Sequence, residues 1–143
     1  MSAPTNIIDQ LRRDEGEVLH AYQDSLGFWT IGVGVLLDSR KGGGISRDES
    51  AMLLQNRVDA KEQQLAAALP WTAGLDPVRR AALLNMSYNL GVPGLLKFET
   101  ALAHIKHGNW QSAHDALLES LWARQVGIRA QRLAAQILTG EWQ

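Results

Sequence analysis

Two carboxylates and a hydroxyl lie close together near the start of this 143-residue chain. Glu15 ends a stretch with helical periodicity, Asp24 follows in a turn, and Thr30 begins the run Thr-Ile-Gly-Val-Gly. A hairpin that folds back over this stretch would bring the three polar groups to one face of a cleft. Two carboxylates that flank a substrate bond are the arrangement that cleaves glycosidic linkages.

The hydrophobic pattern predicts the elements that position these residues. It indicates a helix over 5–15, a small β hairpin over 17–36 and a long helix over 46–69. The long helix opens with the capping box Ser46-Arg47-Asp48-Glu49. Asp76-Pro77 is an N-cap followed by proline at the first helical position. Further helices are predicted over 78–90, 95–106, 110–119 and 128–138.

The composition is that of an ordinary globular protein, with 45% apolar and 20% charged residues. No apolar run approaches the roughly 20 residues that span a bilayer, so we expect no membrane insertion. The start Met1-Ser2-Ala3-Pro4-Thr5 lacks the features of a secretory signal, which predicts synthesis in the cytoplasm. The absence of cysteine excludes disulfides and thiolate chemistry.

The net charge of −1 argues against a general nucleic-acid binder. The charge is unevenly distributed, because residues 1–62 carry −3 and residues 63–143 carry +2. The more basic C-terminal half is the part that would face an anionic polymer.

Other site chemistries have weak support in the sequence. His104 and His107 are one helical turn apart but have no third ligand nearby, so we predict no metal site. The stretch 40–44, Arg-Lys-Gly-Gly-Gly, predicts a flexible loop and lacks the Gly-Lys-Ser/Thr ending of a P-loop. The chain contains neither the His-Glu-x-x-His motif of zinc peptidases nor the Gly-x-Ser-x-Gly motif of serine hydrolases, so the sequence does not support either class.

Several motifs together resemble a known family. Asp14-Glu15-Gly16, Tyr22, Asp24 and Thr30-Ile31-Gly32-Val33-Gly34 resemble the active-site stretch of phage-type lysozymes, the endolysins of glycoside hydrolase family twenty-four. The resemblance continues in order through the central helix and the C-terminal region, at residues 75–86, 129–132 and 139–142.

The resemblance implies a two-lobed α+β lysozyme-like fold in a single domain over 1–143. We expect a small β-hairpin lobe of about 14–55 and a helical lobe of about 1–13 and 70–143, joined by a connecting helix of about 46–69. The implied activity is hydrolysis of the β-1,4 bond between N-acetylmuramic acid and N-acetylglucosamine in peptidoglycan. The expected protein is a monomer without cofactor, metal or nucleic-acid partner, and it reaches the wall after release, as in the lysis of a phage host.

The resemblance also assigns roles within the N-terminal motif. Glu15 becomes the general acid, which donates a proton to the leaving oxygen. Asp24 positions a water molecule or stabilises positive charge at the sugar carbon, and Thr30 orients the attacking water. Taken alone, Asp24 also fits a turn residue and Thr30 an ordinary strand residue.

Outside that motif the resemblance implies three further site residues. Arg129 would pair with the catalytic glutamate, and Leu36 and Tyr88 would line the cleft. The alternatives are a solvated helix arginine for Arg129 and plain core positions for Leu36 and Tyr88. We expect Trp122 and Trp142 to belong to the core rather than to a sugar-binding surface.

One position departs from the family pattern, because Val35 stands where many relatives have a histidine in a structural ion pair. We expect either loss of the partner or apolar repacking there, without a catalytic consequence. Two other functions stay open: a lytic transglycosylase, which needs one acid and releases an anhydro sugar, and a catalytically silent wall-binding or phage structural module. The presence of both Glu15 and Asp24 disfavours the silent module.

Overall fold

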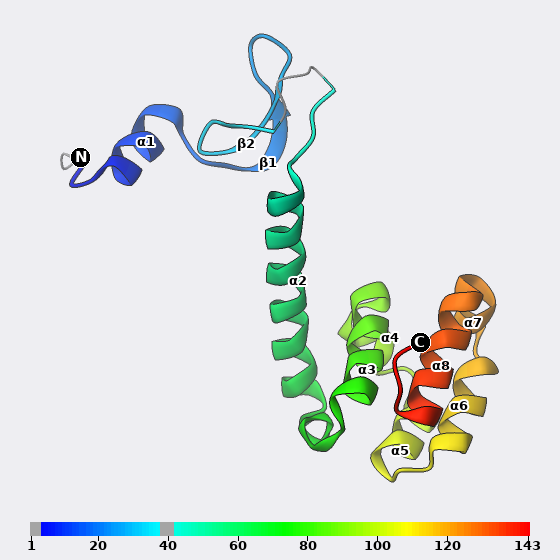
Figure 1. The fold of residues 1–143 in the computed structure, drawn as a ribbon. Coiled ribbons are helices and arrows are strands. Elements are labelled where there is room, and N and C mark those ends of the chain that lie inside the picture. The colour runs from blue at the N-terminus through cyan, green and yellow to red at the C-terminus, as the bar shows by residue number, and fades with distance from the viewer. Residues whose placement is uncertain (1–3, 38–41) are drawn as a thin grey trace. The chain divides into compact units, whose positions relative to one another are not determined.

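The computed structural model describes residues 4–37 and 42–143. The chain divides into two compact units, Met1–Leu53 and Leu54–Gln143. Its described residues are mostly helical with one small antiparallel sheet (Figure 1), which confirms the α+β lysozyme-like class. The boundaries of the two lobes within a single domain stay a prediction.

The first unit consists of one helix and a three-stranded sheet. Asn6 caps the helix by accepting a hydrogen bond from the Asp9 amide at 2.9 Å, and Gly16 ends it as the sequence predicts. The sheet has the order β1-β2-β3, so the predicted hairpin is joined by a third short strand. The elements are α1 (Ile7–Glu15), β1 (Val18–Gln23), β2 (Trp29–Gly32) and β3 (Val35–Leu36).

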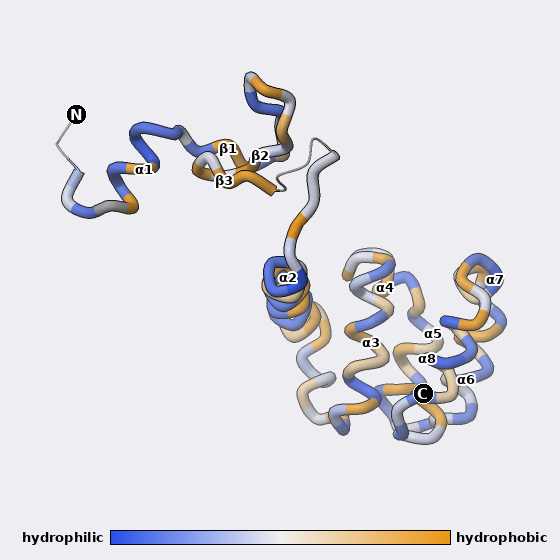
Figure 2. Tube along the Cα trace, turned by 45° about the horizontal axis from the view of Figure 1, so that its top comes forward, coloured by the Kyte–Doolittle hydropathy of each residue, from blue (hydrophilic) through white to orange (hydrophobic). Residues whose placement is uncertain are grey.

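The long helix α2 spans Arg47–Ala68, close to the predicted range. Its capping box is formed in both directions, because the Glu49 amide donates to Ser46 Oγ at 3.1 Å and the Ser46 amide donates to Glu49 Oε1 at 3.0 Å. The helix carries both hydrophilic and hydrophobic residues (Figure 2), and Leu65 is its buried residue.

The elements of the second unit are η1 (Pro70–Gly74), α3 (Pro77–Leu90), α4 (Val92–Leu95), α5 (Glu99–Lys106), α6 (Trp110–Leu118), α7 (Leu121–Val126) and α8 (Ile128–Thr139). In this unit, α8 packs against α3, α6 and α7, and α5 packs against α6. The largest fully buried apolar side chains come from α3, α4, α5, α6 and α8, and these are Leu83, Met86, Leu95, Ile105, Leu117 and Ile137. The core therefore lies among these helices.

Some sequence predictions for this unit need correction. The helix expected over 95–106 begins at Glu99, because Val92–Leu95 forms the separate short helix α4. Trp122 is buried, as predicted, and its indole donates to Asn89 Oδ1 at 2.9 Å. The core prediction for Trp142 is wrong, because this side chain is 69% exposed.

Arg79 ties the start of α3 to the end of α8. Its Nε donates to the Ile137 carbonyl at 2.6 Å, and one Nη donates to the Leu138 carbonyl at 3.1 Å. The guanidinium also lies 4.0 Å from the ring centre of Trp110 and 3.2 Å from a carboxylate oxygen of Asp76. Last-turn carbonyls lack partners within their own helix, so this arginine acts as a C-terminal cap supplied from another element.

No helix within the described ranges is long and apolar enough to cross a membrane. Across the same ranges, no three His, Asp or Glu side chains gather closely enough to hold a metal ion. Of the predicted loop 40–44, residues 40 and 41 lie outside the described residues. Gly43 lies against the Trp29 indole.

Candidate functional site

Glu15 is the last residue of α1 and is exposed to solvent. Its carboxyl lies beside Gly34 in the turn between β2 and β3. Nearby acidic residues are engaged differently. Arg13 Nε lies 2.8 Å from Asp14 Oδ1, and this hydrogen bond lowers the pKa of Asp14. Glu17 lies 3.4 Å from Arg12 Nε. Among the described residues no ion pair involves Glu15.

Asp24 fixes the turn between β1 and β2. Its Oδ1 accepts hydrogen bonds from the Leu26 and Phe28 amides, both at 2.9 Å, and its own amide donates to the Phe28 carbonyl at 2.8 Å. This is the side-chain turn that an aspartate favours at such a position. Oδ1 thus builds the turn, and among the described residues no hydrogen bond reaches Oδ2.

Thr30 lies at the centre of the small sheet. It pairs with Tyr22 of β1 on one side and with Leu36 of β3 on the other. Its side chain is buried and its hydroxyl donates to the Phe28 carbonyl at 3.2 Å. The hydroxyl proton is thus held by the backbone, and the oxygen keeps lone pairs that can accept a hydrogen bond.

Leu36 and Val35 form the apolar edge strand β3, coloured orange in Figure 2. Each is 48% exposed. Leu36 is therefore outside the core of its unit. Val35 is not enclosed by apolar neighbours, so the expected repacking around the missing histidine is not seen in the part of the chain that the structure describes.

The sheet separates the two carboxylate-bearing positions. Asp24 lies at the β1–β2 turn, and Glu15 meets the β2–β3 turn at the other end of β2. The four residues of β2 rise about 3.3 Å each, so the two turns are roughly 10 Å apart. The structure thus places both carboxyl groups around one strand, with Thr30 between the turns.

Asp24→Asn should reduce activity by at least about a hundredfold while leaving the fold intact. The amide keeps the oxygen that accepts the Leu26 and Phe28 amides, so the turn survives and only the charge is lost. Rates of wall cleavage and circular dichroism spectra should be measured together. A rate that merely halves would make Asp24 a turn residue and favour the transglycosylase.

In the second unit, Tyr88 and Arg129 line one pocket of about 330 Å³. The remaining lining residues come from α2, α3 and the C-terminal segment, and these are Leu54, Val58, Ala81, Leu84, Asn85 and Trp142. Tyr88 is 47% exposed, so it is not a core residue of its unit. The structure therefore brings two of the predicted site residues together.

Asn85 is a residue of this pocket that the sequence analysis did not identify. Its Oδ1 accepts from Arg129 Nε at 3.0 Å and from Nη2 at 2.7 Å, and its backbone carbonyl accepts from Nη2 at 3.3 Å. These bonds fix the guanidinium from α3. A solvated helix arginine would not be held at three points, so Arg129 has a defined position in its unit.

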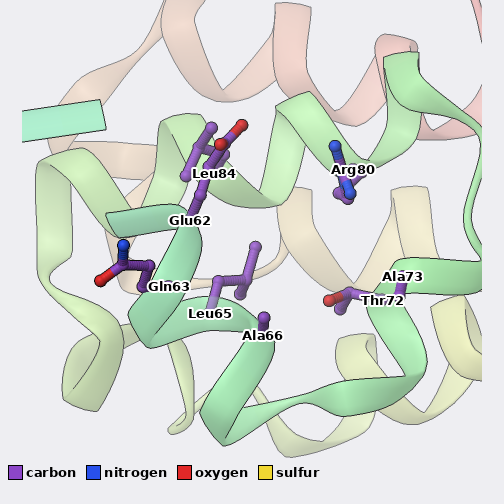
Figure 3. A pocket seen from close by; sticks show the side chains of 8 residues that line it. All are labelled: Glu62, Gln63, Leu65, Ala66, Thr72, Ala73, Arg80 and Leu84. Carbon is purple, nitrogen blue, oxygen red and sulfur yellow. The ribbon is translucent and has the colours of Figure 1, made fainter. Parts of the chain in front are cut away.

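A second pocket of about 260 Å³ lies between α2, η1 and α3 (Figure 3). Its floor includes the buried Leu65 and Thr72, and the Thr72 hydroxyl donates to the Leu69 carbonyl at 2.7 Å. Glu62 is the one carboxylate in its lining, and no predicted site residue contributes to it. A single carboxylate does not fit two-carboxylate glycosidase chemistry.

Comparison with known proteins decides the family. The model of the phage lysozyme family matches residues 12–136. The chain belongs to the phage lysozyme family. This family match runs from the end of α1 through most of α8 and includes all six predicted site residues.

Individual relatives in this family differ in length and in their described roles. The chain is 27% identical to probable T4-type lysozyme 1 of Dictyostelium discoideum, over 95% of each chain. It is 32% identical to the endolysin of Salmonella phage P22, over 87% of this chain and 85% of that protein. It is also 31% identical to the pre-baseplate central spike protein of Enterobacteria phage T4, over 94% of this chain. The chain spans only 28% of that spike protein.

Proposed function

We propose that this chain is a lysozyme that hydrolyses the β-1,4 bond between N-acetylmuramic acid and N-acetylglucosamine in bacterial peptidoglycan. The observation that carries the proposal is the pair of carboxyl groups around β2, in a chain of the phage lysozyme family. The names of the amoebal lysozyme and of the phage P22 endolysin support the same activity.

In this proposal Glu15 donates a proton to the leaving oxygen of the glycosidic bond. Its exposed position at the end of α1 gives a polymer access to the carboxyl. Asp24 activates or positions the water through the carboxylate oxygen that the turn does not use. Thr30 accepts a hydrogen bond from that water, since its own proton is held by Phe28.

The spacing supports water as the nucleophile. Direct attack by a carboxylate requires the two carboxyl groups to be only about 5 Å apart, whereas a larger gap of about 6.5–9.5 Å leaves room for water. Asp24 lies at one end of β2 and Glu15 meets the turn at the other end, which supports the wider arrangement. We therefore propose that Asp24 acts through water.

The substrate-facing surface in this proposal includes Leu36 and Tyr88, two half-exposed apolar side chains that can pack on sugar rings. We propose that the protein acts on the wall as a monomer after its release from the cytoplasm, without a cofactor. The similarity to a phage T4 spike protein supports a second candidate, a structural module without catalysis.

Turbidity of outer-membrane-permeabilised bacteria tests the activity. The wild-type protein should clear the suspension. A folded wild-type protein that leaves turbidity unchanged would support the structural module instead.

We also propose that Arg129 supports Glu15, as the family resemblance implies. Arg129→Ala should lower the lysis rate about tenfold to a hundredfold, because misplacing a catalytic group by about 1 Å has an effect of that order. Arg132→Ala is the matched control, since Arg132 is an exposed arginine on the same helix. Lysis rates of Arg129→Ala and Arg132→Ala, measured at matched protein concentrations, test whether Arg129 supports Glu15. Equal rates would reduce Arg129 to a structural residue of the second unit.

A further inference from the structure

Gly34 lies unusually close to the proposed acid. A Cβ atom on Gly34 would lie 2.8 Å from Glu15 Oε2, 3.0 Å from its Cδ and 3.2 Å from its Cγ. The first of these distances is shorter than real Cβ contacts, so any side chain at position 34 would displace the Glu15 carboxyl. Glycine is the residue that lets a backbone approach another group this closely.

The contact is specific to Gly34 among the glycines around this site. Gly34 has a φ of 63° and Gly32 a φ of 67°, so both occupy the left-handed region that disfavours other residues. A Cβ on Gly32 would have no atom within 4 Å, and the same holds for Gly16 directly after Glu15. A side chain at any of these three positions would thus strain the backbone, whereas at Gly34 it would also collide with the Glu15 carboxyl.

We propose that Gly34 is a positioning residue that sets the location of the Glu15 carboxyl group. The inference rests on the proposed role of Glu15 as the acid. The backbone of Gly34, in the turn that leads into β3, lies directly against the Glu15 carboxyl and limits where it can go. The end of a glutamate side chain rotates easily, so a methyl group at position 34 moves the carboxyl rather than disrupting the sheet.

Consequently, stability and activity should respond differently to substitution. Gly34→Ala and Gly32→Ala introduce the same left-handed strain, so both should lower Tm by a similar amount, roughly 2–6 °C. Only Gly34→Ala displaces the acid. Its kcat on purified wall should fall about a hundredfold with KM within about threefold of wild type, whereas Gly32→Ala should keep kcat within about threefold.

The test therefore compares wild type, Gly34→Ala and Gly32→Ala by steady-state kinetics, melting curves and NMR of the Glu15 side chain. We expect the Glu15 Cγ and Cδ signals to shift in Gly34→Ala and to stay in place in Gly32→Ala. Equal kinetics and equal Glu15 signals in the two variants would overturn the inference while leaving the proposed function standing. An inactive wild-type protein would refute the proposed function, and the NMR comparison would still decide whether Gly34 positions the carboxyl.

Misfolding of Gly34→Ala would also be informative. Adding Glu15→Ala removes all three atoms that the new methyl group meets. If the contact with Glu15 causes the misfolding, the double variant should fold and melt at about the same Tm as Gly32→Ala. A double variant that stays unfolded would overturn the inference, because the damage would then come from the turn itself.

Discussion

Glu15→Gln should remove nearly all wall-cleaving activity while the protein stays folded. Glutamine has almost the same shape as glutamate, so it fits the same space beside Gly34. It carries no acidic proton, and general acid catalysis contributes roughly 10²–10⁴-fold to a rate. Because Glu15 is exposed at the end of α1, the substitution should change the free energy of unfolding by no more than about 0.5 kcal/mol.

Glu17→Gln is the matched control for this experiment. Glu17 lies two residues further on, is exposed, and pairs with Arg12 at 3.4 Å. Its removal changes the net charge by the same amount but leaves Glu15 untouched, so its lysis rate should stay within about twofold of wild type. If Glu15→Gln keeps more than about a tenth of wild-type activity, Glu15 is not the general acid.

Arg79→Ala should cause a large loss of stability in the second unit. The guanidinium satisfies two carbonyls at the end of α8, stacks on Trp110 and pairs with Asp76. A hydrogen bond to a charged group contributes about 1.5–3 kcal/mol, and removing the donor leaves its acceptors unsatisfied. We expect a loss of about 3–5 kcal/mol in the free energy of unfolding.

Arg80→Ala provides the comparison for Arg79, because it removes an arginine from the next position on α3. Arg80 is exposed, and its loss should cost no more than about 0.5 kcal/mol. Urea unfolding of both variants measures the difference, with an unchanged m-value as the sign that only stability has changed. Equal losses for the two arginines would mean that the cap on α8 contributes little.

Two helices that combine a capping signal with a long hydrophobic pattern, α2 and α3, could be predicted from the sequence. The capping box at Ser46 and the Asp76 N-cap form as expected, with Asp76 Oδ2 accepting from the Arg79 amide at 3.0 Å. The short helix α7 was missed although Ser120 caps it by accepting from the Ala123 amide at 3.2 Å. A helix of six residues has too few turns for hydrophobic periodicity to show, so the cap was the one signal for α7.

The candidate site could be predicted only in part, because its contacts join distant parts of the chain. Residue types and family resemblance pointed to Glu15 and Asp24. The approach of Gly34 to Glu15 and the bonds from Arg129 to Asn85 depend on tertiary packing. No local pattern encodes them. The prediction for Trp142 failed because aromatic character alone does not fix burial, and this largely exposed side chain lines a pocket.

Mass spectrometry of purified peptidoglycan after digestion by the wild-type protein tests the central claim most directly. Hydrolysis adds one water molecule at each cleaved bond, so we expect fragments that end in reducing N-acetylmuramic acid, and none of them from Glu15→Gln. Fragments ending in anhydro-N-acetylmuramic acid would identify a lytic transglycosylase. An uncleaved wall in the presence of folded protein would contradict the enzymatic account altogether.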